Sequence, residues 1–126
     1  MTPAKPAAPA PLAPGLASGI DQRTLIRLKR GQVRPETQID LHRLTQPEAH
    51  AALAGFLTSA QRGGRRCVLV ITGKGYGSEG AIGVLRRNVP RWLNESPNRE
   101  RVLAFAYATP LDGGEGALYV LLRRIR

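Results

Sequence analysis

The spacing of apolar and polar side chains predicts four strands in this chain. Residues 37–42 alternate between polar and apolar side chains, which indicates a strand with one buried face. Residues 66–72 contain five consecutive apolar side chains, a pattern typical of a strand buried on both faces of a parallel sheet. Further apolar runs at 101–108 and 117–125 predict two more strands, and a glycine-rich turn at 110–116 separates them.

A helix is predicted between the first two strands. Thr45, Pro47 and Glu48 have the spacing of a capping box with proline in the first helical turn. Apolar side chains then recur every three or four residues through 49–60, so they cover one face of the helix. Gly63 and the glycine after it end the pattern.

Two further helices are expected. One begins near Ala81 and precedes the third strand, and Pro90 interrupts it, so we expect a kink or two short helices. The other is a short leading helix over 22–30, capped by Asp21 and stopped by Gly31.

The order of these elements predicts an α/β fold. It is β-α-β-α-β-β, a two-layer sandwich in which two helices pack on a mixed four-stranded sheet, with a short leading helix before it. The β-α-β units make their strands parallel, and the hairpin-like last link makes the fourth strand antiparallel to the third.

The 126 residues fit a single domain with an N-terminal extension. Residues 1–19 are mostly Ala and Pro and are expected to form a disordered tail. Residues 20–35 form the basic leading helix and a linker, and residues 36–126 form the domain. No apolar stretch approaches the length of a membrane span, and the lone Cys67 is expected to be a small buried side chain in a reducing compartment. We therefore expect a cytoplasmic protein.

Charge is the first indication of function. Nineteen Lys and Arg side chains against nine Asp and Glu give a net charge of +10, and such a field attracts polyanions, of which nucleic acid is the commonest. Solubility alone is the competing explanation. The leading helix concentrates basic side chains that could contact phosphates: Arg23, Arg27, Lys29 and Arg30.

Asp40 and His42 follow each other at the end of the first strand. Residues two apart on a strand face the same side, so the carboxylate can orient the imidazole and stabilise its charged form. An Asp–His pair that only satisfies backbone groups remains an equal alternative.

A glycine-rich loop, 72–80, follows the second strand. Gly73 and Gly75 allow backbone N–H groups to approach an anion, and Lys74 between them adds a positive charge. The spacing is not that of a Walker A loop. Tyr76 is placed to stack on a base or to pack locally. Ligands of open α/β sheets bind beyond the carboxyl ends of parallel strands, so this loop, the Asp–His pair and the turn at 113–116 are expected at one edge.

Three motifs resemble the Smr (small MutS-related) domain family. Residues 39–49, IDLHRLTQPEA, are similar to the family opening L-D-L-H-G-x-T-x-x-E-A, and residues 72–75, TGKG, to its H-G-x-G motif. Residues 113–122, GGEGALYVLL, resemble its G-G-x-G-A-x-x-V-x-L ending. Arg43 stands where the family usually has Gly, and Thr72 where many members have His.

The resemblance implies a fold like the C-terminal domain of a translation initiation factor. It also implies nucleic-acid binding and, in several members, endonuclease activity on DNA or RNA, including messenger RNA at stalled ribosomes. By this resemblance Asp40 and His42 are the catalytic pair, and Lys74, held by its two glycines, binds phosphate. Arg43 would add a phosphate contact, and Thr72, in the same loop as Lys74, is also expected to bind phosphate.

Three functions remain under consideration. The leading hypothesis is an endonuclease in which His42 is the general base or acid and Asp40 orients it. The alternative is a non-catalytic module that binds nucleic acid or a ribosome, and a small-molecule phosphate enzyme is the least favoured. No cofactor is expected. Mg²⁺ is not favoured because few carboxylates are available to hold it, namely Asp40 with Glu79 or Glu115. The sequence leaves open the choice of RNA or DNA and the oligomeric state.

Overall fold

Five strands form one mixed sheet in the computed structural model, which describes residues 12–17, 20–73 and 80–125. In spatial order they are β1 (Leu16–Ala17), β4 (Val102–Tyr107), β5 (Ala117–Leu122), β3 (Cys67–Ile71) and β2 (Thr37–Asp40). β2 and β3 are parallel, and β5 lies between β3 and β4 and runs antiparallel to both. The four predicted strands and the mixed sheet are confirmed, and β1 is an additional edge strand.

Three helices cover one face of the sheet: α2 (Gln46–Arg62), α3 (Gly80–Leu93) and α4 (Asn98–Arg101). The capping box of α2 is present, because the Thr45 hydroxyl accepts from the Glu48 N–H and the Glu48 carboxylate accepts from the Thr45 N–H. Pro90 lies inside α3 near its end, so the segment is one helix rather than two, and α4 was not predicted.

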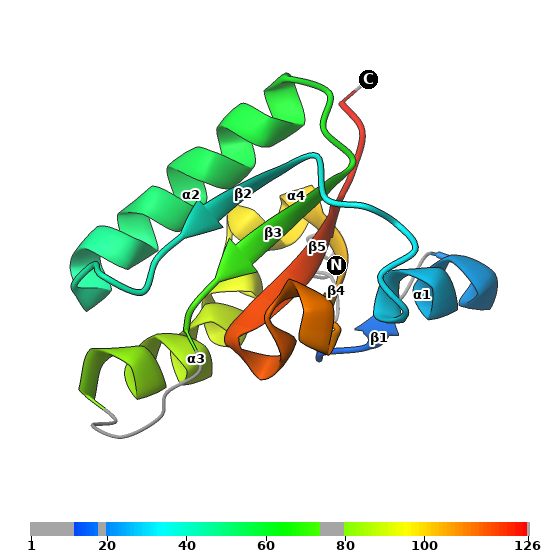
Figure 1. Cartoon of the computed structure of the whole chain (residues 1–126). Helices are drawn as coiled ribbons and strands as arrows, with labels where there is room; N and C mark the ends of the chain where they lie inside the picture. The colour runs from blue at the N-terminus through cyan, green and yellow to red at the C-terminus, as the bar shows by residue number, and fades with distance from the viewer. Residues whose placement is uncertain (1–11, 18–19, 74–79, 126) are drawn as a thin grey trace, which may run out of the picture.

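The helix α1 (Gln22–Lys29) covers part of the opposite face, over β4 and β5. Leu25 and Leu28 pack in a core cluster with Cys67, Leu69 and Tyr119. Successive β3 residues alternate between this cluster and the one beneath α2, so the strand is buried on both faces, as its apolar run predicted. Cys67 is buried, and burial raises the pKa of its thiol to about 12. Figure 1 shows α1 on the side of the sheet away from α2.

Residues 12–17 are ordered, although they belong to the segment expected to be a disordered tail. β1 pairs antiparallel with β4, and Leu12 is buried in the core beneath α3. The Asn94 side chain accepts from the Leu12 N–H (2.6 Å) and donates to the Leu12 carbonyl (2.8 Å). The Ala/Pro composition gave no sign of this docking, because its partners lie more than 80 residues away.

No helix in the part of the chain that the structure describes is long and apolar enough to cross a membrane.

Candidate functional site

Three chain segments meet where β2 and β3 end and β5 begins. The sheet register pairs Asp40 with Ile71 and Ile71 with Ala117, and the Leu41 N–H donates to the Ile71 carbonyl (2.8 Å). The arrowheads of β2 and β3 in Figure 1 point to the same end of the sheet, where the turns before β5 also lie. We call residues 40–43, 72–73 and 113–116 the strand-end rim.

Asp40 and His42 contact each other at this rim. Asp40 is the last residue of β2, and its Oδ1 contacts His42 Nδ1 and accepts from the His42 backbone N–H (3.1 Å). Partial burial raises the pKa of Asp40, but the hydrogen bonds from the His42 ring and backbone outweigh it, so the pKa is lowered overall. β2 stops before His42, so a tight turn, rather than the strand alternation that we expected, brings the two side chains together. His42 is 34% exposed, which leaves the ring accessible.

Arg43 contacts the other ring nitrogen of His42. Its Nε donates to His42 Nε2 over 3.3 Å, so Nε2 is an acceptor and the ring proton lies on Nδ1, toward Asp40. The exposed guanidinium of Arg43 therefore lies beside a nitrogen that can take up a proton. This arrangement brings a positive charge, a base and an orienting carboxylate to one point of the rim.

Thr72 and Gly73 connect the end of β3 to the turn before β5. Both N–H groups donate to the Gly116 carbonyl, over 2.8 and 3.0 Å. Gly73 has φ +92°, which L side chains rarely adopt. The Thr72 hydroxyl is 3.4 Å from the carbonyls of Gly73 and Gly116, and the residue is 2% exposed. Thr72 thus braces the rim from inside, whereas we expected it to contact phosphate.

Two side-chain contacts hold the glycine turn in place. Glu115 forms an ion pair with Arg86 of α3. Asp112, in the short helix η1 (Pro110–Asp112), accepts both guanidinium N–H groups of Arg34, over 2.7 and 3.0 Å. The hydrogen bonds from Arg34 and then from Tyr119 lower the pKa of Asp112 to about 2. Sequence reasoning missed this contact because 78 residues separate Arg34 from Asp112.

The other predicted site residues fall into two sets. Lys74, Gly75 and Tyr76 lie outside the described residues. The basic side chains of the leading helix lie on or next to α1, which contacts β5 and β4, two and three strands away from β2. They therefore form a separate surface: Arg23, Arg27, Lys29 and Arg30.

No three His, Cys, Asp or Glu side chains within residues 12–17, 20–73 and 80–125 gather closely enough to hold a metal ion. Of the carboxylates considered for Mg²⁺, Asp40 contacts His42, Glu115 pairs with Arg86, and Glu79 lies outside the described residues.

The fold and the rim define a small α/β domain with an acid–imidazole pair at the end of a parallel strand pair. The model of the Smr domain matches residues 39–123, and the chain belongs to the Smr domain family. This confirms the resemblance seen in the sequence motifs.

Relatives and solved structures support the assignment. The ribosome rescue factor SmrB of Tolumonas auensis is 35% identical over 98 residues, which are 78% of this chain and 51% of that protein. The SmrB of Pasteurella multocida is 37% identical over 106 residues, covering 84% of this chain and 58% of that protein. The chain thus spans about half the length of these relatives.

Two solved structures share the fold. The stand-alone small MutS-related protein YdaL from Escherichia coli superposes with a TM-score of 0.69 at 32% identity, covering 84% of this chain and 79% of that chain. The Smr domain of Thermus thermophilus MutS2 gives a TM-score of 0.59, also at 32% identity, covering 69% of this chain and 98% of that chain.

Proposed function

We propose that the chain binds nucleic acid at the strand-end rim and that it does so on ribosomes. The observation that carries this proposal is the linked group of Asp40, His42 and Arg43, in which an exposed guanidinium lies next to an oriented imidazole. Relatives named ribosome rescue factor supply the ribosome as the setting. A net charge of +10 supports a polyanionic partner.

The rim suits a phosphate for reasons of charge and shape. Arg43 offers several N–H donors in a fork that matches phosphate oxygens. Ribosomal and messenger RNA present phosphates in series, so a protein can bind them at low sequence specificity.

The test of binding compares Arg43→Gln with Arg27→Gln, which removes the same charge from the exposed face of α1. We expect Arg43→Gln to weaken co-sedimentation with ribosomes and binding to single-stranded RNA roughly tenfold, because a phosphate contact is lost. Arg27→Gln should bind like the unaltered protein. Equal binding by all three proteins would refute the rim as the contact.

A second function, cleavage of an RNA phosphodiester at this rim, is favoured by the tautomer of His42. Once Arg43 has turned from Nε2 to the phosphate, Nε2 would accept the proton of a 2′-hydroxyl while that oxygen attacks the adjacent phosphorus. The bond from phosphorus to the 5′-oxygen breaks, and the leaving oxygen takes a proton from water or from the imidazolium. The products are a 2′,3′-cyclic phosphate and a 5′-hydroxyl. Asp40 stabilises the imidazolium, and Arg43 stabilises the charge on the phosphate.

Cleavage is tested with end-labelled RNA, with and without EDTA, followed by mapping of the product ends. We expect His42→Ala to abolish cutting while its circular dichroism spectrum and RNA affinity stay close to those of the unaltered protein. Cutting that persists at the same rate in His42→Ala would exclude His42. Binding without cutting by the unaltered protein would leave the non-catalytic function.

A further inference from the structure

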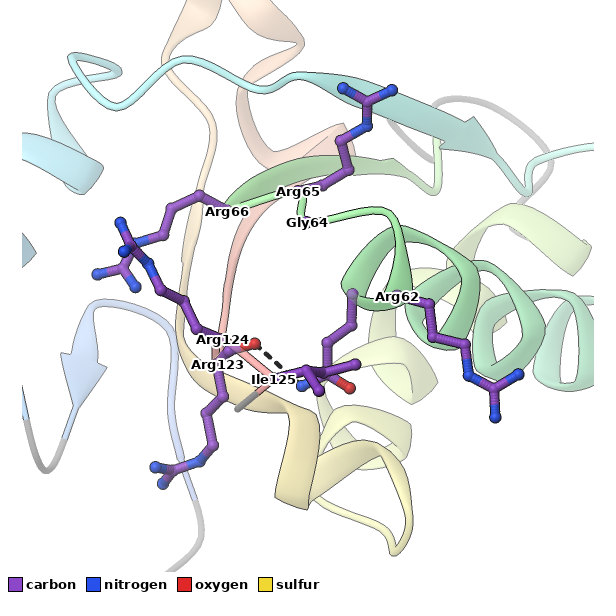
Figure 2. A pocket seen from close by; sticks show the side chains of 8 residues that line it. Arg62, Gly64, Arg65, Arg66, Arg123, Arg124 and Ile125 are labelled. Atoms are coloured by element: carbon purple, nitrogen blue, oxygen red, sulfur yellow. Dashed lines mark hydrogen bonds between the residues drawn. The ribbon is translucent and has the colours of Figure 1, made fainter.

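A second group of basic side chains lies at the opposite end of the sheet from the rim. These residues flank the start of β3 and the end of β5, where they line an open pocket of about 500 Å³ together with Gln61, Gly64 and Ile125. Figure 2 shows them around this pocket, and in Figure 1 the chain after β5 runs toward the end of α2. We call them the arginine end: Arg62, Arg65, Arg66, Arg123 and Arg124.

We propose that the arginine end is a second binding site for the phosphate backbone of the same nucleic acid. This inference rests on the proposed function, because it extends the bound strand from the rim to the far end of the sheet.

The backbone at this end is held in place by hydrogen bonds. The Arg66 carbonyl accepts from the Leu122 N–H (2.8 Å), which continues the ladder between β3 and β5. The Gln61 side chain donates to the Arg123 carbonyl (3.0 Å) and so ties the end of α2 to the end of β5. Two arginine-bearing segments that are far apart in sequence are therefore fixed side by side.

The cluster is short of negative charge. Among the described residues, one carboxylate contacts it: Glu36 lies 3.9 Å from Arg65 and accepts from the Arg66 backbone N–H (2.7 Å). Burial lowers the pKa of the neighbouring Arg99; repulsion from Arg123 adds to this, and attraction to Glu100 opposes it. Like charges held on neighbouring strands cost stability, so this arrangement is better explained by an anionic ligand than by folding.

The distance between the two sites fits a nucleic acid strand. Five β3 residues at about 3.3 Å each, with the flanking residues, separate the rim from the arginine end by roughly 20 Å. One strand of a helical nucleic acid presents a phosphate about every 3.4 Å along the helix axis, so about six phosphates would span that distance. One guanidinium group can donate two hydrogen bonds to the oxygens of one phosphate. The pocket is open, so a nucleic acid strand can pass through it, whereas a closed pocket would select a small molecule.

The experiment compares three variants. The arginine-end variant combines Arg66→Gln with Arg124→Gln, and the rim variant carries Arg43→Gln alone. The control on α1 combines Arg23→Gln with Arg27→Gln. The two double variants lose the same charge, and α1 lies on the other face of the sheet. Binding of a single-stranded RNA of about 20 nucleotides is measured over a range of salt. For the arginine-end variant we expect affinity lower by on the order of 10- to 100-fold at low salt and a log–log salt slope shallower by about 1.4. Its thermal midpoint should stay level or rise.

The outcomes separate this inference from the proposed function. Weak binding by both the Arg43 variant and the arginine-end variant supports two sites on one strand. If only the Arg43 variant binds weakly, the arginine end is not a nucleic-acid site and the proposed function stands. If only the arginine-end variant binds weakly, the arginine end is a site and the rim is not. Equal loss in the α1 control would mean that the loss follows net charge or contact with α1 rather than the arginine end, and this outcome would overturn the inference. So would unchanged RNA binding combined with lost binding to vesicles rich in phosphatidylserine, because the partner would then be a lipid surface.

Discussion

His42 has a different partner at each ring nitrogen, and this difference determines what the side chain can do. Asp40 contacts Nδ1 and Arg43 donates to Nε2, so the neutral ring presents a lone pair at Nε2. An imidazole with this tautomer can accept a proton at Nε2 without first turning over.

Removal of the Asp40 carboxylate should weaken the preference of the His42 ring for the Nδ1-protonated tautomer. In Asp40→Ala we expect the His42 ring to become a mixture of tautomers, because only the 3.3 Å hydrogen bond from Arg43 to Nε2 then still favours the proton on Nδ1. Nitrogen chemical shifts of the neutral His42 ring, measured by NMR, report the two forms. His50, which is paired with Glu95, serves as the internal control and should not change. A single Nδ1-protonated form in the variant would show that Asp40 does not orient the ring.

The Arg34–Asp112 pair predicts a dependence of stability on pH. The folded-state pKa of Asp112 is about 2, below its ordinary value of 3.8, so the pair stabilises the fold above pH 3.8 and this contribution is lost as the pH falls toward 2. Asp112→Asn should therefore lower the thermal midpoint at pH 6 and match the unaltered protein near pH 2. A difference that stays constant from pH 6 to pH 2 would contradict this role.

Contacts between neighbours in sequence were predictable, and distant ones were not. Asp40 with His42 and Thr45 with Glu48 lie two and three residues apart, so spacing alone identified them. Arg34 and Asp112 are brought together only by the packing of α1 and the turn before β5. For the same reason the sequence could not tell that Thr72 would face inward, since its partner is the Gly116 carbonyl.

At the scale of elements, patterning predicted the four main strands and the helices between them, because each element buries one face or both. It did not predict which face of the sheet α1 covers, because a short amphipathic helix fits either face. It also missed β1, whose two residues carry no periodic signal. The placement of β5 between β3 and β4 depends on the register of the whole sheet.

The N-terminal segment should contribute measurably to stability. Leu12 is 7% exposed and packs in the core beneath α3, so Leu12→Ala should lower the free energy of unfolding by about 2–3 kcal/mol. Leu111→Ala is the matched control, because Leu111 is 97% exposed and should lose almost nothing. Urea unfolding measures both. Equal small losses would mean that residues 12–17 detach readily in solution.

At the scale of the molecule, ten of the nineteen basic side chains lie on three surfaces: the strand-end rim, the arginine end and the surface of α1. Their placement followed from the fold, while the excess of arginine was visible in the composition. Charge alone predicted a polyanionic partner, but the sheet decides which arginines lie close enough to bind one strand together.

Added salt should therefore act in opposite directions on the free protein and on its complex. The chain has nineteen basic and nine acidic side chains, so the excess positive charges repel one another in the folded state. Raising the salt from about 0.05 to 0.5 M shortens the screening length well below 10 Å. We expect the thermal midpoint of the free protein to rise by a few degrees over this range. Its affinity for RNA should fall steeply, because the release of counterions from RNA gains less entropy at high salt. Sulfate is avoided, since an anion that binds arginine would stabilise the fold by occupancy rather than by screening. A midpoint that falls with chloride would mean that ion pairs such as Arg34–Asp112 and Arg86–Glu115 outweigh the repulsion, and that the surplus charge carries no cost for a ligand to relieve.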